Sequence, residues 1–307
     1  MPPNSQPHLK DLSCPSTGLD LALDLFITAK EAERCTVRTV KTYRWTLRQF
    51  LDWLKARDVL EVQVITPHHI RQFLAGLDQQ GCAASYIHIY ARTIKTWVRF
   101  LHMEGLLAAD PMQKVAMPRL AHEVLPAFTP EEVKRLLSAC HTKRDTALVL
   151  ALLDTGCRAA ELVGLNIDDI DLSTGAVTVR LGKGGKSRTT YLGSKATRAL
   201  HRYLAERPPA GPDAPLFPSA TTAERLTTNG LLLLCRRLGQ RAGVARCNPH
   251  KFRRTFALWS LRAGMNIYAL QRLMGHSELT VLQRYLALVE QDLQQAHRKC
   301  GAVDCTL

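Results

Sequence analysis

Long hydrophobic runs are absent from this chain of 307 residues. The longest, Ala147–Leu153, is far shorter than the ~18–20 apolar residues that cross a bilayer. The stretch from Met1 to Lys10 is polar and proline-rich and lacks the apolar core of a signal peptide. The sequence therefore predicts neither a membrane span nor a membrane partner.

Paired cysteines are also missing. The nine cysteines are scattered, none forms a C-x-x-C pair, and the close pair Cys300 and Cys305 has no second pair nearby. This pattern argues against a disulfide framework and against a zinc site. We therefore expect reduced thiols, a cytoplasmic location and no metal ligands.

Acidic residues are in deficit. The 41 Lys and Arg outnumber the 27 Asp and Glu, which makes the net charge +14. Such an excess predicts a polyanionic partner, with nucleic acid favoured over an anionic membrane surface. Residues 1–107 carry a net charge of +3 and residues 108–307 one of +11, so the C-terminal part is the stronger candidate for binding phosphates.

Helical periodicity dominates from about Leu19 to Glu104. Apolar residues recur at helical spacing in two stretches, and basic residues stand between them. For any single helix, a solvated charged face is the better explanation of this pattern. Together with a DNA-binding second domain, the pattern predicts DNA contacts from Arg38, Lys41, Arg44, Arg92 and Lys95.

Prolines and a capping motif divide the chain. Asp110-Pro111 and Met117-Pro118 break helices, and Thr129 with Glu132 forms a capping box that opens a new one. We therefore expect a loose arm (1–17), a helical domain (18–107), a linker (108–125), a second domain (126–299) and a tail (300–307).

The second domain reads as helices around one β-hairpin. Strands are expected at Ala176–Leu181 and Arg188–Leu192, too few for a doubly wound sheet. The expected fold class is mainly α with a small antiparallel β-sheet. The turn between the strands ends in Gly185-Lys186-Ser187, but it fails the phosphate-loop pattern because Arg180 stands where the first glycine is required. We still expect Lys183 and Lys186 at the tip of the hairpin, from where they could reach into a DNA groove.

Several further residues have ordinary explanations when taken singly. His250 and Arg253 share a helix face, and a histidine at position 276 follows a helix end. A lone tyrosine such as Tyr285 is more often a core residue than a nucleophile. Arg158 and Glu161 are one turn apart and are as well explained by a simple ion pair.

Taken together, these residues match the needs of phosphodiester cleavage without a metal. Two arginines neutralise the non-bridging oxygens, a lysine protonates the leaving alkoxide, and a tyrosine attacks the phosphorus. No acidic cluster that would hold magnesium accompanies them. The set comprises Arg158, Lys183, His250, Arg253, His276 and Tyr285.

At this point the sequence resembles the tyrosine recombinase, or phage integrase, family. The resemblance is carried by Thr155–Leu162, the hairpin at Gly182–Gly184, Pro249–Thr255, and Leu273–Ser277 with Tyr285. It covers nearly the whole chain, because the basic region before residue 107 looks like the family's core-binding domain. Two departures, Ala160 for a serine and Arg254 for a frequent histidine, remove no reacting group.

The resemblance implies a two-domain DNA clamp and a role for each residue of the set. Tyr285 would form a 3′-phosphotyrosine, Arg158 and Arg253 would clamp the phosphate, and Lys183 would be the general acid. His276 would donate to the phosphate, His250 would assist proton transfer, and Glu161 would orient a neighbouring basic group.

The resemblance also implies partners and rivals. It implies double-stranded DNA as the partner, a homotetramer on that DNA, and no ATP or other cofactor. A type IB topoisomerase and a non-catalytic DNA-binding regulator remain as alternatives. The short arm before residue 18 favours an Xer-like or transposon-type system over an integrase that reads two kinds of site.

Overall fold

The structure is a computed structural model, and it describes residues 18–120, 125–180, 187–222 and 224–275. The chain forms two units, Met1–His122 and Glu123–Leu307, which are described separately below. Helices predominate in the described ranges, and the strands there form one small antiparallel sheet. The expected fold class, mainly α with a small antiparallel sheet, is confirmed.

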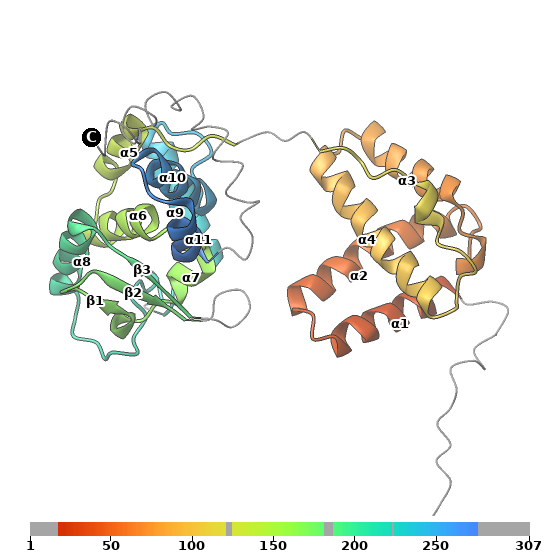
Figure 1. The fold of residues 1–307 in the computed structure, drawn as a ribbon, viewed down its shortest axis with the longest axis horizontal. Coiled ribbons are helices and arrows are strands. Elements are labelled where there is room, and N and C mark those ends of the chain that lie inside the picture. Colours follow the sequence, from red (N-terminus) through yellow and green to blue (C-terminus); the bar gives the residue numbers. More distant parts are fainter. Residues whose placement is uncertain (1–17, 121–124, 181–186, 223, 276–307) are drawn as a thin grey trace, which may run out of the picture. The chain divides into compact units, whose positions relative to one another are not determined.

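Within residues 18–120, the first unit contains four α-helices (Figure 1). Thr36 and Thr66 open the second and third of these, since each threonine oxygen accepts a backbone N–H three residues on. The elements are α1 (Leu19–Ala32), α2 (Val37–Lys55), η2 (Val62–Val64), α3 (Pro67–Gln79), α4 (Ala84–Met103) and η3 (Pro111–Lys114).

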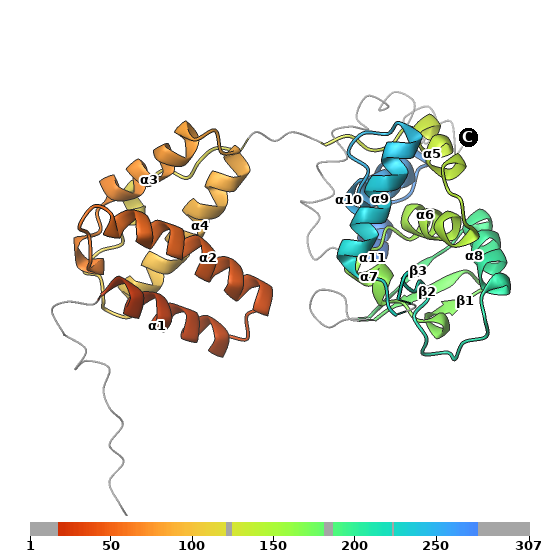
Figure 2. The ribbon, with the colours of Figure 1, turned by 180° about the vertical axis from the view of Figure 1, so that it is seen from behind.

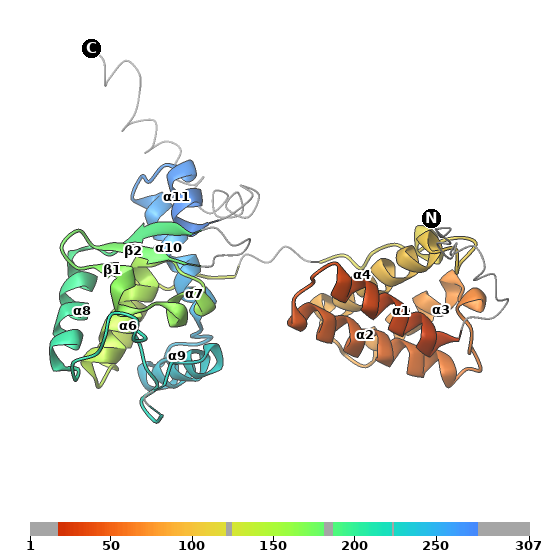
Figure 3. The same ribbon diagram turned by 90° about the horizontal axis from the view of Figure 1, so that it is seen from below.

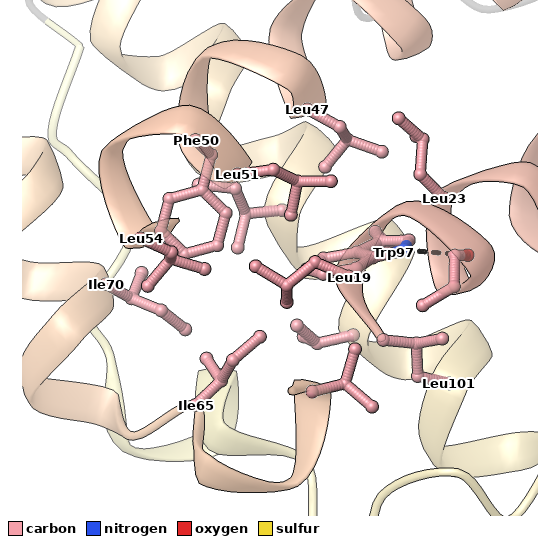
Figure 4. Close-up of a cluster of buried hydrophobic side chains, with 14 of the residues drawn as sticks. Leu19, Leu23, Leu47, Phe50, Leu51, Leu54, Ile65, Ile70, Trp97 and Leu101 are labelled. Carbon is pink, nitrogen blue, oxygen red and sulfur yellow. Dashed lines mark hydrogen bonds between the residues drawn. The ribbon is translucent and has the colours of Figure 1, made fainter. Parts of the chain in front are cut away.

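The core of this unit is aliphatic and aromatic, with side chains from all four helices (Figure 4). Trp97 of α4 is fully buried, and its Nε1–H donates to the carbonyl of Ala22 at 3.4 Å. Phe50 of α2 packs against Phe73 of α3 with ring centroids 5.0 Å apart. Burial of this apolar surface leaves the basic residues of α2 and α4 on the outside.

The segment after α4 packs against the same core. Met112 and Val115 are buried, and Arg71 of α3 donates to the Lys114 carbonyl at 2.5 Å. These residues fall inside the range 108–125, for which the sequence predicts a linker. The η3 turn that holds Met112 contacts α3 and α4, and Val115 belongs to the same buried cluster, so this part of the range buries apolar surface.

The second unit places helices around the sheet. In Figure 3, α6 and α8 lie on the same side of the strands, and Figure 2 brings α9 to the front. The elements are α5 (Pro130–Ser138), α6 (Lys143–Thr155), α7 (Ala159–Gly164), η4 (Ile167–Asp169), β1 (Ile170–Asp171), β2 (Ala176–Val179), β3 (Arg188–Tyr191), α8 (Ser194–Glu206), α9 (Thr228–Ala242), α10 (Pro249–Arg262) and α11 (Ile267–Met274).

Two local expectations for this unit are confirmed. The capping box of Thr129 and Glu132 opens α5, with Pro130 at its first position. The hairpin strands β2 and β3 pair antiparallel, with Val179 opposite Arg188. The turn between them, and the helices expected after residue 279, lie outside the described residues. None of the described helices combines the length and the apolar character needed to span a membrane.

Candidate active site

The end of α6 sets the position of Arg158. Gly156 closes that helix in the left-handed conformation, at φ +58°, where a Cβ would overlap the Phe256 ring. Two residues later, Arg158 is the N-cap of α7. Its backbone N–H and its Nη1 both donate to the Glu161 carboxylate at 2.8 Å. The ion pair that explains these two residues locally is therefore part of the site.

Glu161 is the shared partner of two arginines. It is 8% exposed, and besides Arg158 it accepts from Nη1 and Nη2 of Arg188 at 3.0 and 2.7 Å. The guanidinium of Arg253 lies 3.9 Å away. Burial by itself raises the pKa of Glu161, but the hydrogen bonds from Arg188 and Arg158 outweigh burial and lower that pKa to about 2. The carboxylate is thus ionised at physiological pH.

The start of α10 presents His250 and Arg253 one turn apart. Asn248 is the N-cap and accepts the N–H of Lys251, with Pro249 at the first helical position. Arg253 is buried, and its Nη1 donates to the Gly156 carbonyl at 2.5 Å. Burial and the nearby Arg158 lower the pKa of Arg253 to about 10, partly offset by Glu161. Arg253 therefore remains a cation at neutral pH.

The C-terminal end of α11 holds all three arginines. Three consecutive carbonyls there each accept from one guanidinium: Leu273 from Arg188 at 2.8 Å, Met274 from Arg253 at 2.8 Å, and Gly275 from Arg158 at 3.3 Å. The last carbonyls of a helix lack intrahelical partners and carry partial negative charge. This helix end, directly before position 276, thus supplies counter-charge to the cluster.

Arg158 and Arg253 keep hydrogen-bonding capacity for a ligand. A guanidinium has five N–H donors, and each of these two arginines uses only its terminal nitrogens in the bonds above. The Nε–H of each has no hydrogen-bond partner among the residues that the structure describes. Two adjacent cations with donors to spare match the oxygens of a phosphodiester.

His250 stands beside this cluster. Partial burial, and then the charges of Arg253, Arg254 and Arg158, lower the pKa of His250. Its imidazole is consequently neutral at physiological pH and has one nitrogen able to accept a proton.

The structure brings together Arg158, Arg253 and Glu161 from the predicted set, with His250 at their edge. Lys183, Lys186, His276 and Tyr285 lie outside the described residues. Sequence reasoning missed Arg188. The only sequence signal was that a basic residue begins the strand after the turn that contains Lys183. Nothing at that position indicates that the side chain is buried.

The basic residues predicted to contact DNA differ in their surroundings. Arg38 and Lys41 on α2 are exposed, as are Arg92 and Lys95 on α4. Arg44 is half-buried and lies 3.7 Å from Asp24 and 3.9 Å from Glu31. Among the described residues, no three His, Cys, Asp or Glu side chains gather as metal ligands would.

Both units match known domain families. Residues 126–292 match the phage integrase family, and residues 23–101 match the phage integrase N-terminal SAM-like domain. The tyrosine recombinase XerA of Thermococcus kodakarensis is 31% identical over 284 residues, which cover 92% of this chain and 96% of that protein.

Two solved structures of recombinases are also similar to this chain. The crystal structure of XerA recombinase is 27% identical, covers 90% of this chain and 98% of its own, and has a TM-score of 0.50. A lambda integrase dimer bound to a COC′ core site has a TM-score of 0.74 at 18% identity, and covers 92% of this chain and 81% of its own. The second likeness is one of fold.

Proposed function

The chain belongs to the phage integrase family and is a tyrosine recombinase. On that premise, we propose that six of its side chains cut and rejoin DNA at a single phosphate. Site-specific recombination is the activity of the relatives that match over nearly the whole chain, so it is favoured over supercoil relaxation and over mere occupancy of DNA. The proposed residues are Arg158, Lys183, His250, Arg253, His276 and Tyr285.

The adjacent guanidiniums of Arg158 and Arg253 carry this proposal. Within the part of the chain that the structure describes, the Nε–H of each has no hydrogen-bond partner, and both side chains are held by the carbonyls at the end of α11. Two cations fixed beforehand neutralise the charge that develops on the non-bridging oxygens, which costs no reorganisation during the reaction. Glu161 orients Arg158 through the two 2.8 Å hydrogen bonds.

The remaining roles follow from the chemistry of strand exchange. The Tyr285 oxygen attacks the phosphorus, a phosphotyrosine bond forms at the 3′ side, and the bond to the 5′ oxygen breaks. Lys183 gives its proton to that leaving oxygen, and His276 donates a hydrogen bond to the phosphate. Neutral His250 assists proton transfer by taking up the proton that the Tyr285 hydroxyl loses. A 5′ hydroxyl then attacks the phosphotyrosine and releases the enzyme. The phosphodiester energy is conserved, so no ATP enters.

The proposed partner is double-stranded DNA. The exposed residues Arg38, Lys41, Arg92 and Lys95 would contact the backbone, with Lys186 in a groove and Arg44 beside them. We further propose that the two units close as a clamp around a duplex, and that four copies assemble on DNA through the tail at 300–307.

Trapping the covalent adduct tests the function. Nicked genomic fragments from the organism that encodes the chain are incubated with the protein, and DNA bound covalently to it is recovered and sequenced. We expect one recurrent site with the protein attached through Tyr285. Tyr285→Phe should bind the same fragments without an adduct. An adduct that persists in Tyr285→Phe would reject the assigned nucleophile.

The tail is tested separately. Removal of residues 300–307 should leave cleavage of a single site intact but reduce the recombinant product and the tetrameric complex seen in gel filtration with DNA. Unchanged assembly after truncation would reject the proposed role of the tail.

A further inference from the structure

Arg188 makes more contacts with the phosphate site than its place in the sequence suggests. It heads β3, and its Nη1 and Nη2 donate to the two oxygens of Glu161 at 3.0 and 2.7 Å. Its Nε donates to the Leu273 carbonyl at 2.8 Å. One side chain thus joins β3, the start of α7 and the end of α11.

The geometry separates Arg188 from the two clamping arginines. Its side chain is 11% exposed, against 31% for Arg158. All three guanidinium nitrogens of Arg188 donate to protein oxygens. The two terminal nitrogens bind Glu161, and Nε binds the end of α11. Arg188 is therefore placed to hold other groups rather than to meet a phosphate.

The end of α11 is shaped around this side chain. Gly275 has φ +64°, and a Cβ there would lie 2.9 Å from Cδ of Arg188. Glycine at this position removes the strain of the left-handed backbone and leaves room for the Arg188 side chain. A larger residue at position 275 would therefore displace the side chain that donates to the Leu273 carbonyl.

We propose that Arg188 is a positioning residue for the phosphate site. By bridging the Glu161 carboxylate and the Leu273 carbonyl, it holds α7 and the end of α11 together, so that Arg158 and Arg253 face one phosphate. The inference rests on the proposed function, since it assumes that these two arginines bind the scissile phosphate.

A planar fork is required for this role. The guanidinium binds the two carboxylate oxygens with parallel donors and a third acceptor with Nε. A lysine ammonium keeps the charge but lacks this fixed geometry. Arg188→Lys therefore preserves net charge while it breaks the bridge.

Arg180 provides a matched control. It follows the last residue of β2 and pairs with Asp168 at 3.0 Å and with Asp169, so it also ties the hairpin to carboxylates. Its side chain is 54% exposed, and Glu161 is not among its partners. Arg180→Lys repeats the same chemical change on the neighbouring strand without touching the cluster.

The test is single-turnover cleavage of the nicked site recovered by trapping, with the rate constant and the final amount of adduct measured separately. A merely destabilised enzyme loses final adduct, because fewer molecules are folded, whereas a mispositioned one loses rate. We expect Arg188→Lys to reach the wild-type amount of adduct about 100-fold more slowly. Arg180→Lys should change the rate by less than about fivefold.

The outcomes separate cleanly. A wild-type rate in Arg188→Lys, an equal rate loss in both variants, or a lower yield at an unchanged rate would each overturn the inference while the wild type still cleaves. Absence of an adduct from the wild type itself would reject the proposed function instead. Should Arg188→Lys fail to fold in urea titrations, Gly275→Ala displaces the same side chain, and a wild-type rate there overturns the role.

Discussion

The backbone N–H and the guanidinium of Arg158 both donate to the carboxylate of Glu161, each at 2.8 Å. The first bond caps α7, and the second fixes the side chain of Arg158 at the proposed phosphate site. One carboxylate, which Arg188 also binds, therefore serves both the fold and the proposed site. Loss of that carboxylate should therefore affect both.

Glu161→Gln should reduce both stability and cleavage. Three guanidiniums within the cluster lose their counter-charge, and breaking a buried pair of this kind costs about 3–5 kcal/mol. Urea unfolding at pH 7 measures the loss. The control is Glu206→Gln, which breaks an exposed pair with Lys143 and should cost less than about 1 kcal/mol.

Stability against pH gives the same variant a second test. The pKa of Glu161 is about 2 in the folded protein and near 4.3 in an unfolded chain. Its stabilising contribution is therefore complete above about pH 4.3 and is lost as the pH falls through about 2. The stability gap between wild type and Glu161→Gln should narrow over this window, and a constant gap would contradict the pairing.

Two glycines that end helices should respond differently to alanine. Gly156 and Gly243 close α6 and α9 with φ of +58° and +62°. A Cβ at Gly156 meets the Phe256 ring, whereas one at Gly243 has no neighbour within 4 Å. Gly243→Ala should cost about 1 kcal/mol of backbone strain, and Gly156→Ala about 3 kcal/mol with the added collision. Equal costs in thermal unfolding would show that the backbone alone requires glycine.

Cleavage should depend on pH through His250. Burial and the neighbouring arginines hold the pKa of His250 below its usual value of about 6.5, so the imidazole is neutral from there upward. We expect the single-turnover rate to be level between about pH 6.5 and 7.5 and to fall at lower pH as His250 gains a proton. His250→Asn should be slower and should lack that fall. If the rate of His250→Asn still falls at low pH, the group that titrates is not His250.

Lys183→Ala should act on the leaving group alone. Cleavage of the ordinary site needs a proton on the 5′ oxygen, but a 5′ thiolate leaves without one. The variant should therefore be about 100-fold slower on normal DNA and close to wild type on a substrate with sulfur at that position. Equal defects on both substrates would limit Lys183 to DNA contact.

Two basic residues of α2 should differ in their effect on DNA affinity. Lys41 is exposed, whereas Arg44 forms ion pairs with Asp24 and Glu31. Lys41→Gln should reduce the slope of log affinity against log salt by about 1, since one phosphate contact is lost. Arg44→Gln should reduce it less. A larger effect at Arg44 would mean that binding frees it from the two carboxylates.

Much of the fold could be predicted because its signals are local. The capping box at Thr129, the hairpin strands and the end of α6 at Gly156 each follow from residues a few positions apart. Short-range hydrogen bonds and periodic apolar faces decide such features. Burial of Lys251 could not be read this way: it is 4% exposed, above the Phe128 ring and near Glu132, 119 residues away.

The sequence by itself determined the residue types, their order and the fold class, since periodicity, caps and the reactive groups are written in local patterns. Only the tertiary structure decided that Arg158, Arg188 and Arg253 gather around Glu161 and bind three successive carbonyls at the C-terminal end of α11. Arg188 and Leu273 are 85 residues apart, and the bond between them exists because β3 and α11 pack together. It is the packing of these elements, and no local sequence pattern, that lets the buried Arg188 connect α7 with the end of α11.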